Sequence, residues 1–128
     1  MKQEIYNQLS AKIIECAISV HKHLGPGLLE NVYETCLAKE FELNKIEYKR
    51  QFQLPLIYKG ERLNCNYRID FLIEGKIIVE LKAVEYIMDV HEVQLVTYLK
   101  LSQMKLGLLI NFNETHLIKG VRRKVNNF

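Results

Sequence analysis

The chain has 128 residues, 48% of them hydrophobic, which is the length of one ordinary domain with enough apolar material for a single core. Its formal net charge of +3 permits a nucleic-acid partner but does not require one. No apolar run approaches the roughly 20 residues of a membrane span, and the N-terminus carries acids and amides where a secretory signal would be apolar. We therefore expect a single domain over residues 1–128, soluble and cytoplasmic, with no membrane partner.

The three cysteines, Cys16, Cys36 and Cys65, are widely separated and form no CxxC pair. Their number and spacing do not indicate a zinc site or a redox function. We expect them to be reduced and mostly buried, as small apolar residues.

Helical periodicity dominates the first third of the chain. Apolar residues at helical spacing predict an amphipathic helix over residues 4–24, ended by the Gly-Pro-Gly sequence at 25–27. A second amphipathic helix is predicted over residues 29–43. The period then changes to that of strands. Residues 48–60 predict a strand in which Pro55 marks an edge or a bulge, and strands over 62–73 and 76–83 complete a meander.

The last part of the chain predicts a helix followed by a buried strand. In the helix, over residues 89–102, Asp89 can cap the N-terminus and Glu92 can close a capping box. Residues 105–112 are a nearly unbroken apolar run, typical of a strand covered on both faces, and the helical connection predicts parallel pairing with a right-handed crossover. With a last short strand around residues 115–119, the pattern predicts an α/β fold, a mixed central β-sheet flanked by helices.

Three charged residues, Asp70, Glu80 and Lys82, interrupt the apolar strands over 62–73 and 76–83. The odd-numbered positions are apolar in both strands, which predicts that the odd face is the core and that the charges share the other face. A shared face requires an odd number of loop residues, and a three-residue loop with Gly75 in the left-handed conformation meets this requirement. Asp70 and Glu80 would then be neighbours, with Cβ atoms roughly 5 to 8 Å apart.

Two interpretations of this acid pair stay open at this point. Lys82 and Arg68 could neutralise the acids in a surface ion-pair cluster. Alternatively, the carboxylates could hold a hard cation such as Mg²⁺, which usually binds through one or two carboxylates together with waters and substrate phosphates. Lys82 would then be placed to act on the attacking water. The spacing alone does not decide between them.

The same three charged residues resemble a nuclease signature. "YRID", followed after a hairpin by "VELKA", is similar to the Asp and Glu-x-Lys signature of the PD-(D/E)xK nuclease superfamily, with Asp70, Glu80 and Lys82 at the signature positions. Ile69 stands where a proline is usual, a variation that the superfamily tolerates.

A second motif resembles the small GxxExxY proteins of that superfamily. "GLLENVY" carries Gly27, Glu30 and Tyr33 at the three named positions, and "VHEVQLVTYLK" and "LGLLINF" resemble further segments of the family in the same order. The resemblance covers residues 11–112, nearly the whole chain. It implies a PD-(D/E)xK nuclease-like αβββαβ core with an extra N-terminal helix, and a nuclease that hydrolyses phosphodiester bonds of nucleic acid with Mg²⁺ or Mn²⁺.

The resemblance also implies roles for individual residues. It gives metal binding to Glu30, Asp70 and Glu80, catalysis to Asp70, Glu80, Lys82 and Gln94, and a place lining the site to Gln94 and Tyr98. Each of the further residues has a structural alternative: Glu30 could complement a helix dipole, Gln94 could be a solvated amide and Tyr98 a half-buried ring. We expect Tyr33 to be a packing residue.

Basic residues outside the signature could contact phosphate. His91 lies in the first turn of the third predicted helix, and Arg122 and Arg123 lie in a basic C-terminal segment; together with Lys49 and Arg50, these could bind a nucleic-acid backbone or form a solvated surface. The expected partner is nucleic acid, DNA before RNA, and a homodimer stays open. The rival functions are a catalytically inactive nucleic-acid-binding or regulatory module on the same fold, and a structural partner whose charges only form ion pairs.

Overall fold

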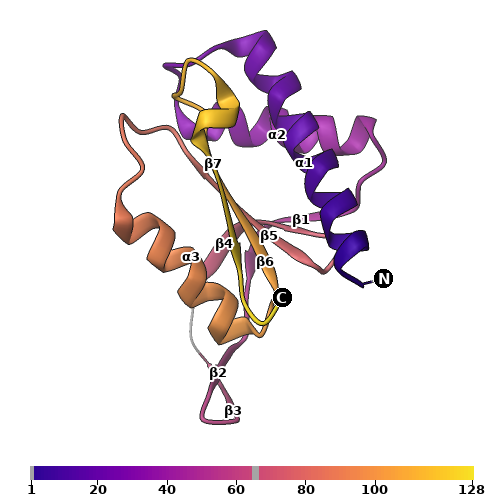
Figure 1. Ribbon diagram of the computed structural model, residues 1–128, viewed down its shortest axis with the longest axis vertical. Helices are drawn as coiled ribbons and strands as arrows, with labels where there is room; N and C mark the ends of the chain where they lie inside the picture. The colour runs from indigo at the N-terminus through magenta and orange to yellow at the C-terminus, as the bar shows by residue number, and fades with distance from the viewer. Residues whose placement is uncertain (1, 65–66) are drawn as a thin grey trace.

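The computed structural model describes residues 2–64 and 67–128 (Figure 1). In chain order the elements are α1 (Lys2–Leu24), α2 (Glu30–Leu43), β1 (Tyr48–Gln53), β2 (Leu56–Tyr58), β3 (Glu61–Leu63), β4 (Arg68–Ile73), β5 (Ile77–Lys82), α3 (Asp89–Ser102), β6 (Leu106–Asn111), the 3₁₀ helix η1 (Leu117–Gly120) and β7 (Val121–Val125). None of the helices described is long and apolar enough to cross a membrane.

Five strands form one mixed sheet in the order β1-β4-β5-β6-β7. β5 and β6 are parallel, as the helical connection between them predicts, and the other neighbours are antiparallel. β2 and β3 form a separate hairpin that projects away from this sheet (Figure 1). The predicted fold class, a mixed sheet flanked by helices, is confirmed.

Helices cover both faces of the sheet, α1 and α2 on one side and α3 on the other (Figure 1). Phe71, Val79 and Leu81 pack with α1 and α2, whereas Leu72 and Ile78 pack with α3. The prediction of a single core on the odd face was therefore incomplete, because the helix that connects two parallel strands must lie against one face of the sheet and here buries the even face. Ile69 is also an exception, since it packs with the α3 cluster.

The predicted helices are confirmed, with ends that differ by at most two residues. The predicted cap of α3 was wrong. Met88, not Asp89, is the N-cap residue, and its N–H donates to Nδ1 of His91 at 3.1 Å. Because the His91 ring already accepts this bond, Glu92 is free for another partner and forms an ion pair with Lys124 of β7 at 2.6 Å.

Three predicted strands have different boundaries in the structure. The strand predicted over 48–60 is divided at Pro55, because proline has no N–H with which to extend a ladder. The strand predicted over 62–73 is likewise two elements, β3 and β4. Residues 115–119 do not form the last strand; η1 buries Leu117 there, and the strand follows as β7.

Two of the three cysteines lie in the part of the chain that the structure describes. Cys16 is buried, Cys36 is half-buried, and both are free thiols. Cys65 lies outside the described residues.

Candidate metal and catalytic site

The hairpin of β4 and β5 sets the geometry of the site. Ile73 pairs with Ile77, so the loop has the predicted three residues, and Gly75 has the predicted left-handed conformation with a φ of +66°. Regular pairing continues only as far as Phe71 opposite Val79. Asp70 comes just before Phe71 in β4, on the side away from the loop. From there the side chain of Asp70, rather than the backbone ladder, connects the two strands.

Both carboxylate oxygens of Asp70 are held by hydrogen bonds. Oδ2 accepts the backbone N–H of Leu81 at 2.8 Å, so the side chain binds the neighbouring strand where a ladder would use a carbonyl oxygen. Oδ1 accepts from Nε2 of Gln51 at 3.3 Å. The half-buried Asp70 carboxylate is thereby fixed between β4 and β5.

Glu80 lies against Asp70. Burial, followed by the Asp70 charge and a hydrogen bond with Asp70, raises the pKa of Glu80 from 4.5 to about 9, and the nearby Lys82 charge only partly opposes this. A raised pKa is expected where two carboxyl groups lie close together in a buried place, because ionising both of them is energetically unfavourable. Without a cation, Glu80 therefore keeps its proton near neutral pH. We call Asp70 and Glu80 the acid pair.

Lys82 stands at the end of β5, two residues after Glu80, and is half-buried. Its charge opposes the rise in the pKa of both Glu80 and Glu30. In the part of the chain that the structure describes, ion pairs involve Glu34 and Glu92, and none joins Lys82 or Arg68 to the acid pair. The ion-pair cluster that the sequence left open does not form among these residues.

Glu30, the first residue of α2, faces the same charges. Burial raises its pKa, the Asp70 charge adds to the rise, and Lys82 lowers it. α2, on the face of the sheet opposite α3, therefore brings a third acid, Glu30, close enough to Asp70 and Lys82 for their charges to shift its pKa.

The loop before α2 is held in a specific shape. Gly27 has a φ of +94°, which favours glycine, and its N–H donates to Oδ1 of Asn113 at 3.0 Å. The hydroxyl of the fully buried Tyr33 donates to the carbonyl of Gly25 at 2.6 Å and accepts the N–H of Leu28 at 3.1 Å. Tyr33 is thus the predicted packing residue, and it fixes the loop from which Glu30 starts.

α3 contributes one side chain to the edge of the site. Burial raises the pKa of Tyr98, and the charges of Glu80 and Asp70 raise it further, which places the phenol near the acid pair. The Tyr98 ring lies 5.0 Å from the ring of Tyr67. Gln94, one turn earlier on α3, is exposed, and His91 caps the helix.

The structure does not bring Arg122 and Arg123 to the acid pair. Both lie on β7, the edge strand separated from β5 by β6. Arg122 pairs with Leu109 and Arg123 with Leu108, whose side chains belong to the cores on opposite faces of the sheet, so the two arginines also face opposite sides. Each is engaged locally, Arg122 by the carbonyl of Lys119 at 2.7 Å and Arg123 by Oδ1 of Asn7 at 2.7 Å.

Sequence reasoning missed the polar residues behind Asp70. Glu34 of α2 is 6% exposed, and its two oxygens accept from Nε of Arg50 and from Nε2 of Gln51, both at 2.6 Å. A pocket of about 480 Å³ lies beside them, lined by Glu30, Asn31, Glu34, Arg50 and Gln51. The spacing of Glu30 and Glu34, four residues apart on one helical face, was the available signal.

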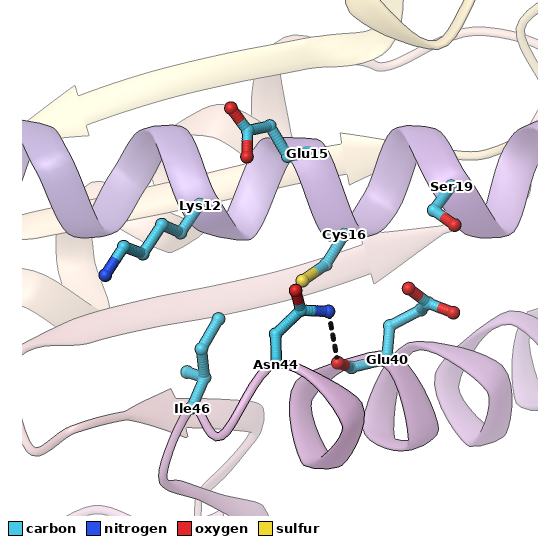
Figure 2. Close-up of a pocket in the computed structure, with 7 residues that line it drawn as sticks. All are labelled: Lys12, Glu15, Cys16, Ser19, Glu40, Asn44 and Ile46. Atoms are coloured by element: carbon cyan, nitrogen blue, oxygen red, sulfur yellow. Dashed lines mark hydrogen bonds between the residues drawn. The ribbon is translucent and has the colours of Figure 1, made fainter.

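A different polar pocket, of about 380 Å³, lies between α1 and α2 (Figure 2). It is lined by Lys12, Glu15, Cys16, Ser19, Glu40, Asn44 and Ile46, and Cys16 points from α1 toward α2. Burial, with the charges of Glu40 and Glu15, raises the pKa of Cys16 to about 11. The thiol therefore stays protonated at neutral pH and is not an activated nucleophile.

The donor set fits a hard cation bound by two protein carboxylates. Among residues 2–64 and 67–128, no three His, Cys, Asp or Glu side chains are gathered closely enough to hold a metal ion by themselves. Mg²⁺ does not require such a cage, since it usually takes one or two carboxylates and completes its shell with water and substrate phosphate. The acid pair supplies that number of carboxylates and forms no ion pair with a basic side chain in the described structure.

Comparison with known proteins agrees with this geometry. The profile of the PD-(D/E)XK nuclease superfamily matches residues 7–124, a range that includes Asp70, Glu80 and Lys82. No curated protein and no solved structure matches the chain. Nucleases of this superfamily generally use divalent metal ions and act on nucleic acid. The match spans nearly the whole chain and includes the strands that carry the acid pair, so the chain belongs to the PD-(D/E)XK nuclease superfamily.

Proposed function

We propose that this protein is a nuclease that hydrolyses phosphodiester bonds of nucleic acid, DNA before RNA, with Mg²⁺ or Mn²⁺. The acid pair is the observation that carries the proposal. Two carboxyl groups in hydrogen-bonding contact repel each other when ionised, and no basic side chain in the described structure forms an ion pair with either. A bound cation accounts for this arrangement, whereas the alternative of a surface ion-pair cluster does not.

Each residue of the site has a distinct part in this proposal. Asp70 and Glu80 would hold the cation, and Glu30 would bind a water of the cation from α2. The cation supplies positive charge that polarises a phosphodiester and neutralises the acid pair. Lys82 would stabilise the negative charge that develops on the phosphate, or orient the attacking water. Tyr98 would line the edge of the site from α3, and the exposed Gln94, one turn earlier, would contact the substrate.

We further propose that the protein is of the GxxExxY type. Each named position of the motif has a structural part in placing Glu30: Gly27 permits the positive φ, Tyr33 binds the loop through two hydrogen bonds, and Glu30 begins the helix. The motif thus serves to present one acid to the acid pair, which is a reason for it to accompany the Asp and Glu-x-Lys signature.

Cleavage of a panel of single-stranded, duplex and branched DNA, with matching RNA, tests the proposal. We expect Mg²⁺- or Mn²⁺-dependent cleavage by the wild type and none by Asp70→Asn. Lys82→Ala should cleave more slowly than the wild type. Its matched control is Lys76→Ala, which removes a lysine from the loop end of the same hairpin. If the wild type binds these substrates but cleaves none of them with either ion, the protein is instead an inactive binding module on this fold.

A further inference from the structure

Gln51 has an unusual backbone conformation beside the acid pair. Its φ of +51° lies in the left-handed region, which residues other than glycine and asparagine rarely adopt. The residues on either side, Arg50 and Phe52, keep the β1–β4 register opposite Phe71 and Ile69, so an inserted residue does not explain the conformation. The other described non-glycine residues with positive φ lie in turns, at a helix end or near the C-terminus: Lys45, Lys59, Glu74, Gln103 and Asn127.

The Gln51 side chain bridges two carboxylates. Its Nε2 donates to Oε1 of Glu34 at 2.6 Å and to Oδ1 of Asp70 at 3.3 Å. A primary amide has two N–H groups, so it can serve both acceptors at once. Since Oδ2 of Asp70 is held by the N–H of Leu81, the bond from Gln51 fixes the remaining rotation of that carboxylate.

Glu34 is a rigid anchor for this amide. It is 6% exposed, and its second oxygen accepts from Nε of Arg50 at 2.6 Å. Nη2 of Arg50 in turn donates to Oγ1 of Thr35 at 3.0 Å. A buried carboxylate with a charged partner does not move freely, and it therefore holds the Gln51 amide in a fixed place relative to α2.

A neutral donor suits this position better than a basic one. A lysine or arginine at position 51 would pair with Asp70 and compete with a cation for its charge. An amide orients the carboxylate without neutralising it. Strained backbone that persists next to reactive groups is a recurrent feature of functional sites.

We propose that Gln51 is a positioning residue of the nuclease site, which orients Asp70 for the cation from an anchor formed by Glu34 and Arg50. This inference rests on the proposed function. The left-handed conformation of Gln51 within β1 would serve the same role, because it occurs where the Gln51 amide lies between the two carboxylates.

Calorimetric titration of the intact protein with Mn²⁺ tests this role in four variants. Gln51→Gly removes the amide and suits the backbone conformation, and Gln51→Leu removes the donors but keeps a long side chain. Gln103→Gly is the matched control, since Gln103 is a second glutamine with positive φ, at the end of α3. Asp70→Asn reports on the metal site itself. We expect both Gln51 variants to bind Mn²⁺ at least about tenfold more weakly than the wild type, the usual effect of losing a residue that orients a ligand, and Gln103→Gly to bind normally.

The melting temperatures separate positioning from a general structural role. Gln51→Gly removes hydrogen bonds but also removes strain, so we expect it to melt within a few degrees of the wild type, as Gln103→Gly does. Wild-type Mn²⁺ affinity in both Gln51 variants, with binding lost in Asp70→Asn, would overturn this inference and leave the proposed function standing. Absence of Mn²⁺ binding by the wild type, or full binding by Asp70→Asn, would overturn both.

Discussion

The two ends of the β4–β5 hairpin use the same pair of strands in different ways. At the loop end, Ile73 and Ile77 are fully buried and opposite each other in a regular backbone ladder. At the other end, regular pairing stops after Phe71 and Val79, and the Asp70 side chain binds the backbone of β5. The loop end thus contributes apolar burial, while the open end carries acids that burial disfavours. The contrast indicates that stability and chemistry are located at opposite ends of one hairpin.

The sharpest test of this contrast is Asp70→Asn. We expect metal-dependent cleavage to fall by at least about a hundredfold, because a neutral amide is a poor ligand for a hard cation. The asparagine oxygen can still accept the Leu81 N–H, and loss of the Asp70 charge lowers the pKa of Glu80, so that holding Glu80 in the fold at neutral pH is less unfavourable. The apo protein should therefore melt at the same temperature as the wild type or higher. A parallel loss of activity and of thermal stability would show that the two ends are not separable.

Ile77→Ala, at the loop end, should give the opposite result. Truncating a fully buried isoleucine removes apolar contacts and leaves a cavity, which typically lowers the free energy of unfolding by about 2–5 kcal/mol. Urea denaturation measures this loss. At a temperature where the variant remains folded, its specific cleavage activity should match that of the wild type. Substantial loss of activity in the folded variant would contradict the separation.

Lys82→Ala should reduce the cleavage rate by at least about tenfold, or about 1.4 kcal/mol of transition-state stabilisation. Because Lys82 forms no ion pair with the acid pair in the described structure, the variant should still fold and bind Mn²⁺. Single-turnover cleavage at saturating Mg²⁺ measures the effect, with Lys76→Ala as the control. Equal rates for Lys82→Ala and the wild type would exclude Lys82 from the mechanism.

The last prediction concerns the pH dependence of stability without metal. The pKa of Glu80 is about 9 in the folded protein against an ordinary value of 4.5, so the folded state keeps a proton that the unfolded chain releases between these values. Stability should therefore decrease as pH rises through this window. The stability of the Glu80→Gln variant should decrease less over the same pH range. Saturating Mg²⁺ should remove most of the decrease in the stability of the wild type. Melting curves between about pH 5 and about pH 9 measure it; identical slopes for wild type and Glu80→Gln would refute the assignment.

Local patterns in the sequence predict the parts of the molecule that local forces determine. Alternating apolar residues predict the β4–β5 hairpin and its three-residue loop, and the helical connection predicts the parallel pairing of β5 with β6. The predicted capping by Asp89 fails because two neighbouring residues can serve one helix end, and the N–H of Met88 binds His91. Neighbours in a strand face opposite sides, so the adjacent Arg122 and Arg123 do not form one basic surface.

The residues behind Asp70 could not be found from local patterns. Gln51 and Glu34 are 17 residues apart in the chain, and their contact depends on how α2 packs beside β1. The positive φ of Gln51 has no signal in the sequence, because glutamine is not a residue that predicts such a conformation. A site whose ligands lie on a signature can be predicted, whereas the side chains that orient those ligands require the structure.

Anomalous diffraction from crystals of the wild type soaked in Mn²⁺ would show whether Asp70 and Glu80 bind a cation. We expect one strong peak at the open end of the hairpin, with a carboxylate oxygen of Asp70 and one of Glu80 each roughly 2.2 Å away, the oxygen distance of a small hard cation. The same soak of Asp70→Asn should lose the peak. A peak in the pocket between α1 and α2, near Glu15 and Glu40, with none at the acid pair, would contradict metal binding by Asp70 and Glu80 (Figure 2).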